Sequence, residues 1–102
     1  MYGTVARMRF TPGSEAMLQV SLEAFQDKDP SSGFVSWTFY RSDDDPLEVW
    51  LSVVFESKDA YRANAESESQ HARYIRLRSI LEDDPEWHDG EVLHRSVSAA
   101  GA

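Results

Sequence analysis

The chain contains no cysteine among its 102 residues. This absence excludes disulfide bonds, thiolate nucleophiles and zinc sites with sulfur ligands. The sequence also lacks the GxSxG elbow of many hydrolases, the HExxH metal motif, a phosphate-binding glycine loop and a dinucleotide fingerprint. Any redox chemistry must therefore proceed without a tightly bound nucleotide.

Long apolar runs are also missing. No stretch approaches the roughly 20 apolar residues that a transmembrane helix requires. The beginning of the chain, MYGTVARMRF, contains no apolar core of signal-peptide length. We therefore expect a cytoplasmic protein with no membrane partner.

Basic residues are scarce, because ten Lys and Arg face eighteen Asp and Glu, which gives a net charge of −8 at pH 7. This charge would repel a nucleic-acid backbone, so no nucleic-acid partner is expected. The acidic run at residues 43–45 lacks the spaced ligands and distal glutamate of a calcium loop. His88 has no second ligand at metal-binding spacing. We expect neither a metal nor any other cofactor.

Apolar side chains are plentiful, at 41% of the chain, and aromatic residues make up 12%. This composition is typical of a folded domain rather than a disordered segment. The length suits a single core, so we predict one domain over residues 1–95. The small residues near the end predict a flexible tail over residues 96–102.

The first part of the chain predicts a strand followed by a helix. Residues 2–10 alternate with period two, which is typical of a strand. One face would carry Thr4, Ala6, Met8 and Phe10, and the other Val5, Arg7 and Arg9. After a turn, the capping residue Ser14 starts a helix over residues 14–28. Its buried side is predicted to carry Met17, Leu18, Leu22 and Phe25.

The rest of the chain predicts a hairpin, a second helix and a last strand. These elements lie at residues 34–41 (strand), 47–56 (strand), 57–82 (helix) and 91–97 (strand), with a loop at 83–90. An interruption of the second helix at residues 66–69 is left open, because four consecutive residues there lack apolar side chains. The β-α-β-β-α-β order predicts the ferredoxin-like α+β fold, a four-stranded antiparallel sheet with both helices on one face.

Both hairpin strands carry apolar side chains on both faces. In the first strand, Val35, Trp37 and Phe39 oppose Phe34 and Tyr40. In the second strand, Leu47, Val49, Leu51, Val53 and Phe55 oppose Trp50 and Val54. The helices can cover only one face, and soluble monomers rarely expose so large an apolar patch on the other. We therefore predict a homodimer formed by sheet-to-sheet packing. The alternative is an ordinary sheet with a few exposed aromatic residues.

A row of polar side chains on the second helix is the strongest candidate for chemistry. Asn64, His71 and Arg78 are seven residues apart and lie on one side of the helix, beside Tyr74. An amide, an imidazole, a guanidinium and a phenol are groups that can line a cavity and polarise a small molecule. Each group taken singly also fits a structural role, such as a half-exposed histidine, a core aromatic ring or a solvent-directed arginine.

Three stretches, VARMRFTPG, GFVSWTFYR and VVFESKDAYRANAESESQHARYIRLRSIL, resemble the antibiotic biosynthesis monooxygenase (ABM) family. The resemblance implies a homodimer whose two sheets form a dimeric α/β barrel, with a pocket between sheet and helices in each subunit. Some members of that family oxygenate phenols or quinols to quinones without a cofactor, and others degrade haem. The haem-degrading members use an asparagine, a tryptophan and a histidine where this chain has Ala6, Asn64 and Tyr74. Haem handling is therefore the less favoured expectation.

The leading hypothesis is a cofactor-independent monooxygenase that acts on a small phenol or quinol. His71 would accept the substrate proton, and Tyr74 would position the ring. Asn64 and Arg78 would stabilise developing oxyanions. The predicted substrate-binding residues are Trp37, Trp50 and Met8, although core or interface packing also explains the tryptophans. The alternative hypothesis is a non-catalytic dimeric ligand-binding or stress-associated protein of the same fold.

Overall fold

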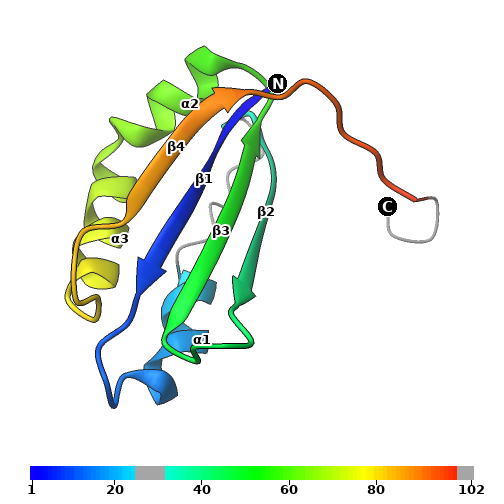
Figure 1. Ribbon diagram of the computed structural model, residues 1–102. Helices are drawn as coiled ribbons and strands as arrows, with labels where there is room; N and C mark the ends of the chain where they lie inside the picture. The colour runs from blue at the N-terminus through cyan, green and yellow to red at the C-terminus, as the bar shows by residue number, and fades with distance from the viewer. Residues whose placement is uncertain (25–31, 99–102) are drawn as a thin grey trace.

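Helices cover one face of a four-stranded antiparallel sheet in this protein (Figure 1). The structure is a computed structural model, and it describes residues 1–24 and 32–98. The elements are β1 (Tyr2–Arg9), α1 (Glu15–Ala24), β2 (Phe34–Arg41), β3 (Glu48–Phe55), α2 (Lys58–Ala65), α3 (Glu68–Arg78) and β4 (Glu86–Glu91). The strand order β2-β3-β1-β4 is the ferredoxin-like arrangement, so the predicted fold class is confirmed.

β1 lies inside the sheet and pairs antiparallel with both β3 and β4. Thr4, Ala6 and Met8 are buried on the helix-covered face, which we call the inner face. Val5 and Arg7 are exposed on the opposite, outer face. The strict alternation predicted from the sequence is confirmed, because this strand has neighbours on both sides that fix its register.

The core fills the space between the inner face and the helices. Its described members are Ala6, Met8, Phe10, Leu18, Val49, Leu51, Val53, Phe55, Leu77 and Leu81. Phe10 extends the buried row of β1 beyond the strand and forms an isolated bridge with Leu81. Its N–H donates to the carbonyl of Leu47 at 2.8 Å. These contacts join the end of β1 to the end of the helical layer and to the start of β3.

A β-bulge in β2 changes the face on which one aromatic side chain lies. Phe34 pairs with Phe55 and Ser36 pairs with Val54, so the register shifts between Phe34 and Ser36. The extra residue moves Phe34 to the inner face, beside Trp37, with ring centroids 5.8 Å apart. The prediction that Phe34 opposes Trp37 is therefore wrong, because it assumed unbroken alternation.

The second predicted helix is two helices, and the break falls where the sequence allowed one. α2 ends at Ala65, and Ser67 caps α3 by accepting a hydrogen bond from the Gln70 N–H at 3.1 Å. A seven-residue spacing therefore does not keep side chains in one row across the break. In residues 1–24 and 32–98, no helix combines the length and apolar character needed to cross a bilayer.

The last strand lies earlier in the chain than predicted. β4 spans Glu86–Glu91, whereas residues 92–98 form no strand. The sequence predicts a loop over residues 83–90, and this prediction is wrong for residues 86–90, because pairing with β1 overrides the local composition. Trp87 pairs with Ala6 and Asp89 with Thr4, which places Trp87 and Asp89 over the inner face.

α1 buries a narrower apolar face than the sequence predicted. Leu18 is buried, as expected, whereas Met17 is exposed, contrary to prediction. Neighbouring helical residues point about 100° apart, so only one of this pair can face the core. The side chain of Leu22 and the whole of Phe25 lie outside the part of the chain that the structure describes.

Candidate functional site

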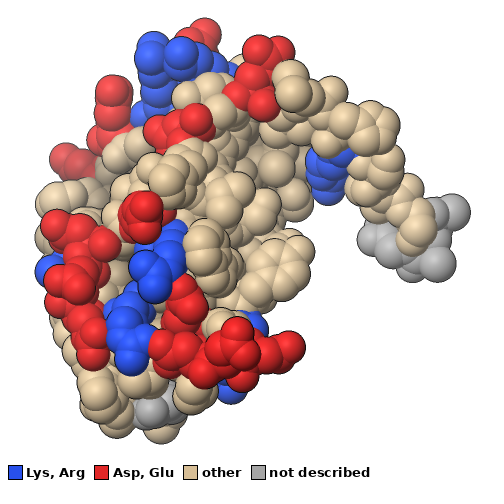
Figure 2. All heavy atoms as spheres, viewed as in Figure 1, with Lys and Arg blue, Asp and Glu red and all other residues tan. Residues whose placement is uncertain are grey.

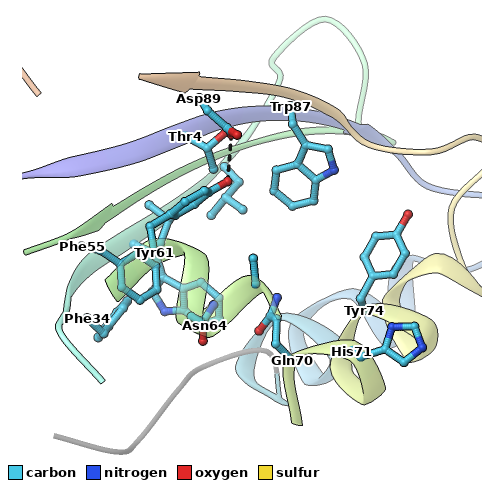
Figure 3. Close-up of a pocket in the computed structure, with 14 residues that line it drawn as sticks. Thr4, Phe34, Phe55, Tyr61, Asn64, Gln70, His71, Tyr74, Trp87 and Asp89 are labelled. Atoms are coloured by element: carbon cyan, nitrogen blue, oxygen red, sulfur yellow. Dashed lines mark hydrogen bonds between the residues drawn. The ribbon is translucent and has the colours of Figure 1, made fainter. Parts of the chain in front are cut away.

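A cavity of about 350 Å³ lies between the inner face of the sheet and the helices α2 and α3 (Figure 3). This volume is near the lower limit of the roughly 300–1,000 Å³ typical of small-molecule sites. The cavity therefore suits a ligand with one ring or two fused rings. Side chains from β1, β2, β3, β4, α2 and α3 contribute to its wall.

Apolar side chains of β2 and β3 form much of the cavity wall. They are Phe34, Trp37, Leu51, Val53 and Phe55. Phe34 packs edge-to-face against both Trp37 and Phe55, with ring centroids 5.8 and 6.0 Å apart. Such a wall excludes water and presents ring faces and edges, which favours a flat aromatic ligand.

A polar cluster formed by Thr4, Tyr61 and Asp89 lies at one end of the cavity (Figure 3). The Tyr61 hydroxyl donates a hydrogen bond to Oδ1 of Asp89 at 2.8 Å. The Tyr61 ring is held by edge-to-face contacts with Tyr2 and Phe55, at 5.2 and 5.7 Å between centroids. This packing fixes the phenol against the carboxylate across two elements that are distant in sequence.

Thr4 stands out in this cluster because its side chain is only 4% exposed. Its hydroxyl lies near the Tyr61 phenol. Within the described part of the chain, however, Oγ1 forms no hydrogen bond of normal geometry. A buried hydroxyl without a partner is unusual, and it costs stability unless a ligand or water satisfies it.

The other end of the cavity is built by polar side chains of α2 and α3. Figure 3 shows His71 and Tyr74 at this end, separated from Thr4 and Asp89, while Gln70 and Asn64 line the helical side between the two ends. His71 is exposed at the rim, and its imidazole makes no hydrogen bond or ion pair with the described residues. Partial burial, and then the negative charge of Asp84, raise the pKa of Tyr74.

Comparison with known proteins identifies the family. Residues 1–75 match the family described as antibiotic biosynthesis monooxygenase. The chain belongs to the ABM family. The resemblance seen in the sequence is thereby confirmed over about three quarters of the chain.

Solved structures show that the ABM fold extends over nearly the whole chain. SnoaB from Streptomyces nogalater, a cofactor-independent oxygenase, is 21% identical with a TM-score of 0.78, covering 92% of this chain and 94% of its own. Rv0793 from Mycobacterium tuberculosis is 18% identical with a TM-score of 0.78, covering 94% and 98%. PA3566 from Pseudomonas aeruginosa is 13% identical with a TM-score of 0.72, covering 91% and 94%. Identities this low establish the fold alone. Among curated proteins, no sequence matches.

Four of the predicted site residues meet in the cavity of this ABM protein. Asn64, His71 and Tyr74 come from the helices, and Trp37 comes from the sheet. The helix break does not separate them, because α2 and α3 both face the same cavity. Their positions agree with the sequence analysis, and their roles remain predictions.

Three other predicted residues lie outside the cavity. Arg78 donates from Nε to Oδ1 of Asp84 at 2.7 Å and from its guanidinium to the Leu81 carbonyl at 3.0 Å. It therefore closes the end of α3 rather than facing a ligand. Trp50 lies on the outer face, because it pairs with Arg7 and Tyr40 in rows that point away from the helices. Met8 is buried in the core and does not line the cavity.

The structure adds residues that the sequence analysis did not consider for the site. They are Thr4, Tyr61, Gln70, Trp87 and Asp89. Thr4 was already predicted on the buried face of β1, which is a signal that could have been used. Trp87 and Asp89 were assigned to a loop, so their approach to the helices was not foreseen. In residues 1–24 and 32–98, no group of three or more His, Cys, Asp or Glu is placed to hold a metal ion.

The environment of Tyr61 predicts a pH-dependent contribution to stability. Burial, and then the hydrogen bond to Asp89, raise the pKa of Tyr61 above its ordinary value of 10.0. The folded chain therefore keeps this proton at a pH where the unfolded chain releases it. The stabilisation is complete below about pH 10 and is lost as the pH rises further.

We expect the urea midpoint of the wild type to fall between about pH 9.5 and 11, and to fall less in Tyr61→Phe. Part of the decline should remain in the variant, because the pKa of Tyr74 is also raised. Urea denaturation at a series of pH values, followed by far-ultraviolet circular dichroism, measures this difference. If the urea midpoint fell equally steeply with pH in the two proteins, the prediction would be wrong.

Proposed function

We propose that this ABM-family protein is a cofactor-independent monooxygenase that converts a small phenol or quinol to a quinone. The observation that carries the proposal is the cavity itself, an apolar aromatic wall with polar side chains at both ends. Its size fits a ring, and its polar groups fit the oxygen substituents of a ring. SnoaB, which has the same fold, is a cofactor-independent oxygenase, and this supports the same class of reaction.

The proposed reaction converts a phenol with an unsubstituted para carbon and one dioxygen into a para-quinone and one water. His71 accepts the phenolic proton, and the para carbon of the phenolate forms a C–O bond with dioxygen. The proton returns to the outer oxygen and gives a hydroperoxide. His71 then removes the para C–H proton, the C=O bond forms, and the O–O bond breaks. Hydroxide leaves and takes the proton from His71 to become water.

Asn64 and Tyr74 supply the remaining polar contacts in this scheme. Both side chains line the cavity, Tyr74 beside His71 and Asn64 nearer Tyr61. The Asn64 amide can donate a hydrogen bond to negative charge that develops on oxygen, a type of contact that commonly contributes strongly to rate. Tyr74, whose pKa is raised, stays a neutral phenol and acts as a wall and hydrogen-bond donor for the ring.

Replacing His71 with alanine should lower kcat about 100-fold with the best substrate of a phenol and quinol panel, because the proton acceptor is lost. KM should change little, since the apolar wall stays intact. The measurement is oxygen consumption with an oxygen electrode. The matched control is His88→Ala, because His88 lies on the outer face paired with Val5 and contacts Glu86 at 3.2 Å. An unchanged rate in His71→Ala would remove His71 from the scheme.

A non-catalytic ligand-binding protein is the second candidate function. It is favoured by the position of His71, which is exposed and whose ring points away from the Thr4 end of the cavity in Figure 3. The two functions differ in one measurement. If the wild type binds phenols in the cavity but consumes no oxygen above buffer across the panel, the binding function replaces the enzymatic one.

A further inference from the structure

The polar cluster of Thr4, Tyr61 and Asp89 offers hydrogen bonds that the described residues leave unused. The Thr4 hydroxyl is buried and lines the cavity, and among the described residues it has no hydrogen-bond partner of normal geometry, although the Tyr61 phenol lies near it. Asp89 uses Oδ1 to accept from Tyr61, and within the described part of the chain its other oxygen makes no hydrogen bond or ion pair. The unpaired Thr4 hydroxyl is buried and carries a free-energy cost that a bound ligand can remove, whereas Asp89 lies at the exposed edge of the cavity.

The arrangement of donors and acceptors specifies what kind of group fits. Tyr61 already donates its proton to Asp89, which leaves a carboxylate oxygen as an acceptor. Thr4 supplies a hydroxyl that can donate. A ligand hydroxyl matches both, because it donates to the carboxylate and accepts from Thr4. An ether oxygen cannot donate, so an ether ligand would lack the hydrogen bond to the carboxylate.

Tyr61 gives this cluster its rigidity. Its ring is fixed between Tyr2 and Phe55, and its hydroxyl holds one carboxylate oxygen in place. Thr4 and Asp89 are direct neighbours in the antiparallel pairing of β1 and β4. The hydrogen-bonding groups are thus presented by paired strands rather than by loops, which limits the entropy lost when a ligand binds.

We propose that Thr4 and Asp89, with Tyr61 as the positioning residue, bind a hydroxyl group of the ligand at the end of the cavity remote from His71. The inference rests on the proposed function, since it assumes that the cavity takes an aromatic ring. It narrows the substrate class to rings that carry a hydroxyl at the Thr4 end of the cavity in addition to the reacting group near His71. Trp87 lies between the two ends of the cavity (Figure 3), where it would face the aromatic ring of the ligand.

The test compares two ligands that differ only in this hydroxyl, 2-naphthol and 2-methoxynaphthalene. Binding is followed by quenching of tryptophan fluorescence in oxygen-free buffer, so no turnover interferes. The wild type should bind the naphthol about tenfold more tightly than the ether, the effect of one good hydrogen bond. Thr4→Val should reduce this preference to about twofold and leave the affinity for the ether unchanged.

Thr4→Val should also raise Tm by about 4 °C, because it removes a buried hydroxyl that has no partner and keeps the shape of the side chain. A threonine with a purely structural hydrogen bond would give the opposite shift. The matched control is Thr38→Val, because Thr38 is exposed and pairs with Ser52 in the outer rows of the sheet. Thr38→Val should change neither the preference for naphthol over the ether nor the Tm. Asp89→Asn is a second variant, expected to weaken naphthol binding about tenfold while the ether binds as before.

Several results would overturn the proposal. In the first, Thr4→Val still prefers the naphthol as the wild type does. In the second, Thr4→Val has a lower Tm and its affinity for both ligands falls equally. In the third, the wild type binds neither ligand. An unchanged preference would mean that water satisfies Thr4. Failure of the proposed function gives a different result. In that case the wild type consumes no oxygen, but it still prefers 2-naphthol to the ether, and Thr4→Val still loses this preference.

Discussion

Phe10→Ala should lower the free energy of unfolding by about 3–5 kcal/mol, a large part of the roughly 5–15 kcal/mol that stabilises a typical domain. Phe10 is only 1% exposed and is among the largest fully buried side chains. It joins β1 to Leu81 through the isolated bridge and to Leu47 through its N–H. Alanine would keep the backbone contacts and leave a cavity where three segments meet.

Urea unfolding at fixed protein concentration measures this loss, because any dimerisation would make stability depend on concentration. The control is Val20→Ala on α1, whose side chain is exposed, and it should change stability by no more than about 0.5 kcal/mol. If Phe10→Ala behaved like the control, Phe10 would not be part of the core.

The strands show where sequence reasoning succeeds and where it stops. β1 was predicted with its faces correct because it is a central strand, and burial on one side imposes strict alternation. β2 is an edge strand, and its bulge moved Phe34 to the inner face. Bulges favour edge strands, and no residue type in the segment 34–36 signals one.

β4 was missed for a different physical reason. Most of its residues have low strand propensity, and their conformation is set by pairing with β1, 79 to 89 residues earlier in the chain. Local patterns carry no information about a partner so distant. The helix break at residues 66–69 was foreseeable, in contrast, because a capping serine and the absence of apolar side chains are both local features.

The same distinction explains how much of the candidate site could be predicted. Asn64, His71 and Tyr74 meet although the helix breaks between the first two, because α2 and α3 both face the cavity; periodicity within α3 places only His71 and Tyr74 together. Thr4 and Asp89 meet only through strand pairing, which the sequence does not show. The result is a cavity whose helical end was predicted and whose sheet end was found only in the structure.

The outer face of the sheet leads to the second large expected effect. Tyr40 and Trp50 pair across β2 and β3 and are 59% and 37% exposed, and Val5 on β1 is 45% exposed. Figure 2 shows an uncharged area over part of this face, beside charged side chains of both signs. We propose that a second copy of the chain covers this face in a two-fold homodimer, which would bury the same patch on both subunits.

Trp50→Glu should convert this dimer to a monomer. The two-fold axis would bring two added carboxylates into one interface, which should weaken dimerisation at least 100-fold. Light scattering after gel filtration should give twice the 11.6 kDa chain mass for the wild type and a single chain mass for the variant. Because Trp50 is partly exposed on the face away from the core, the circular dichroism spectrum should stay native.

Val20→Glu provides the matched control for the dimer prediction. It adds the same charge at another exposed apolar residue, but on α1, in the helical layer on the opposite side of the sheet. The control should remain a dimer, so loss of assembly in Trp50→Glu alone would locate the interface on the outer face. A wild type that stays a monomer at high concentration, or equal dissociation constants for both variants, would show that this face stays in contact with water.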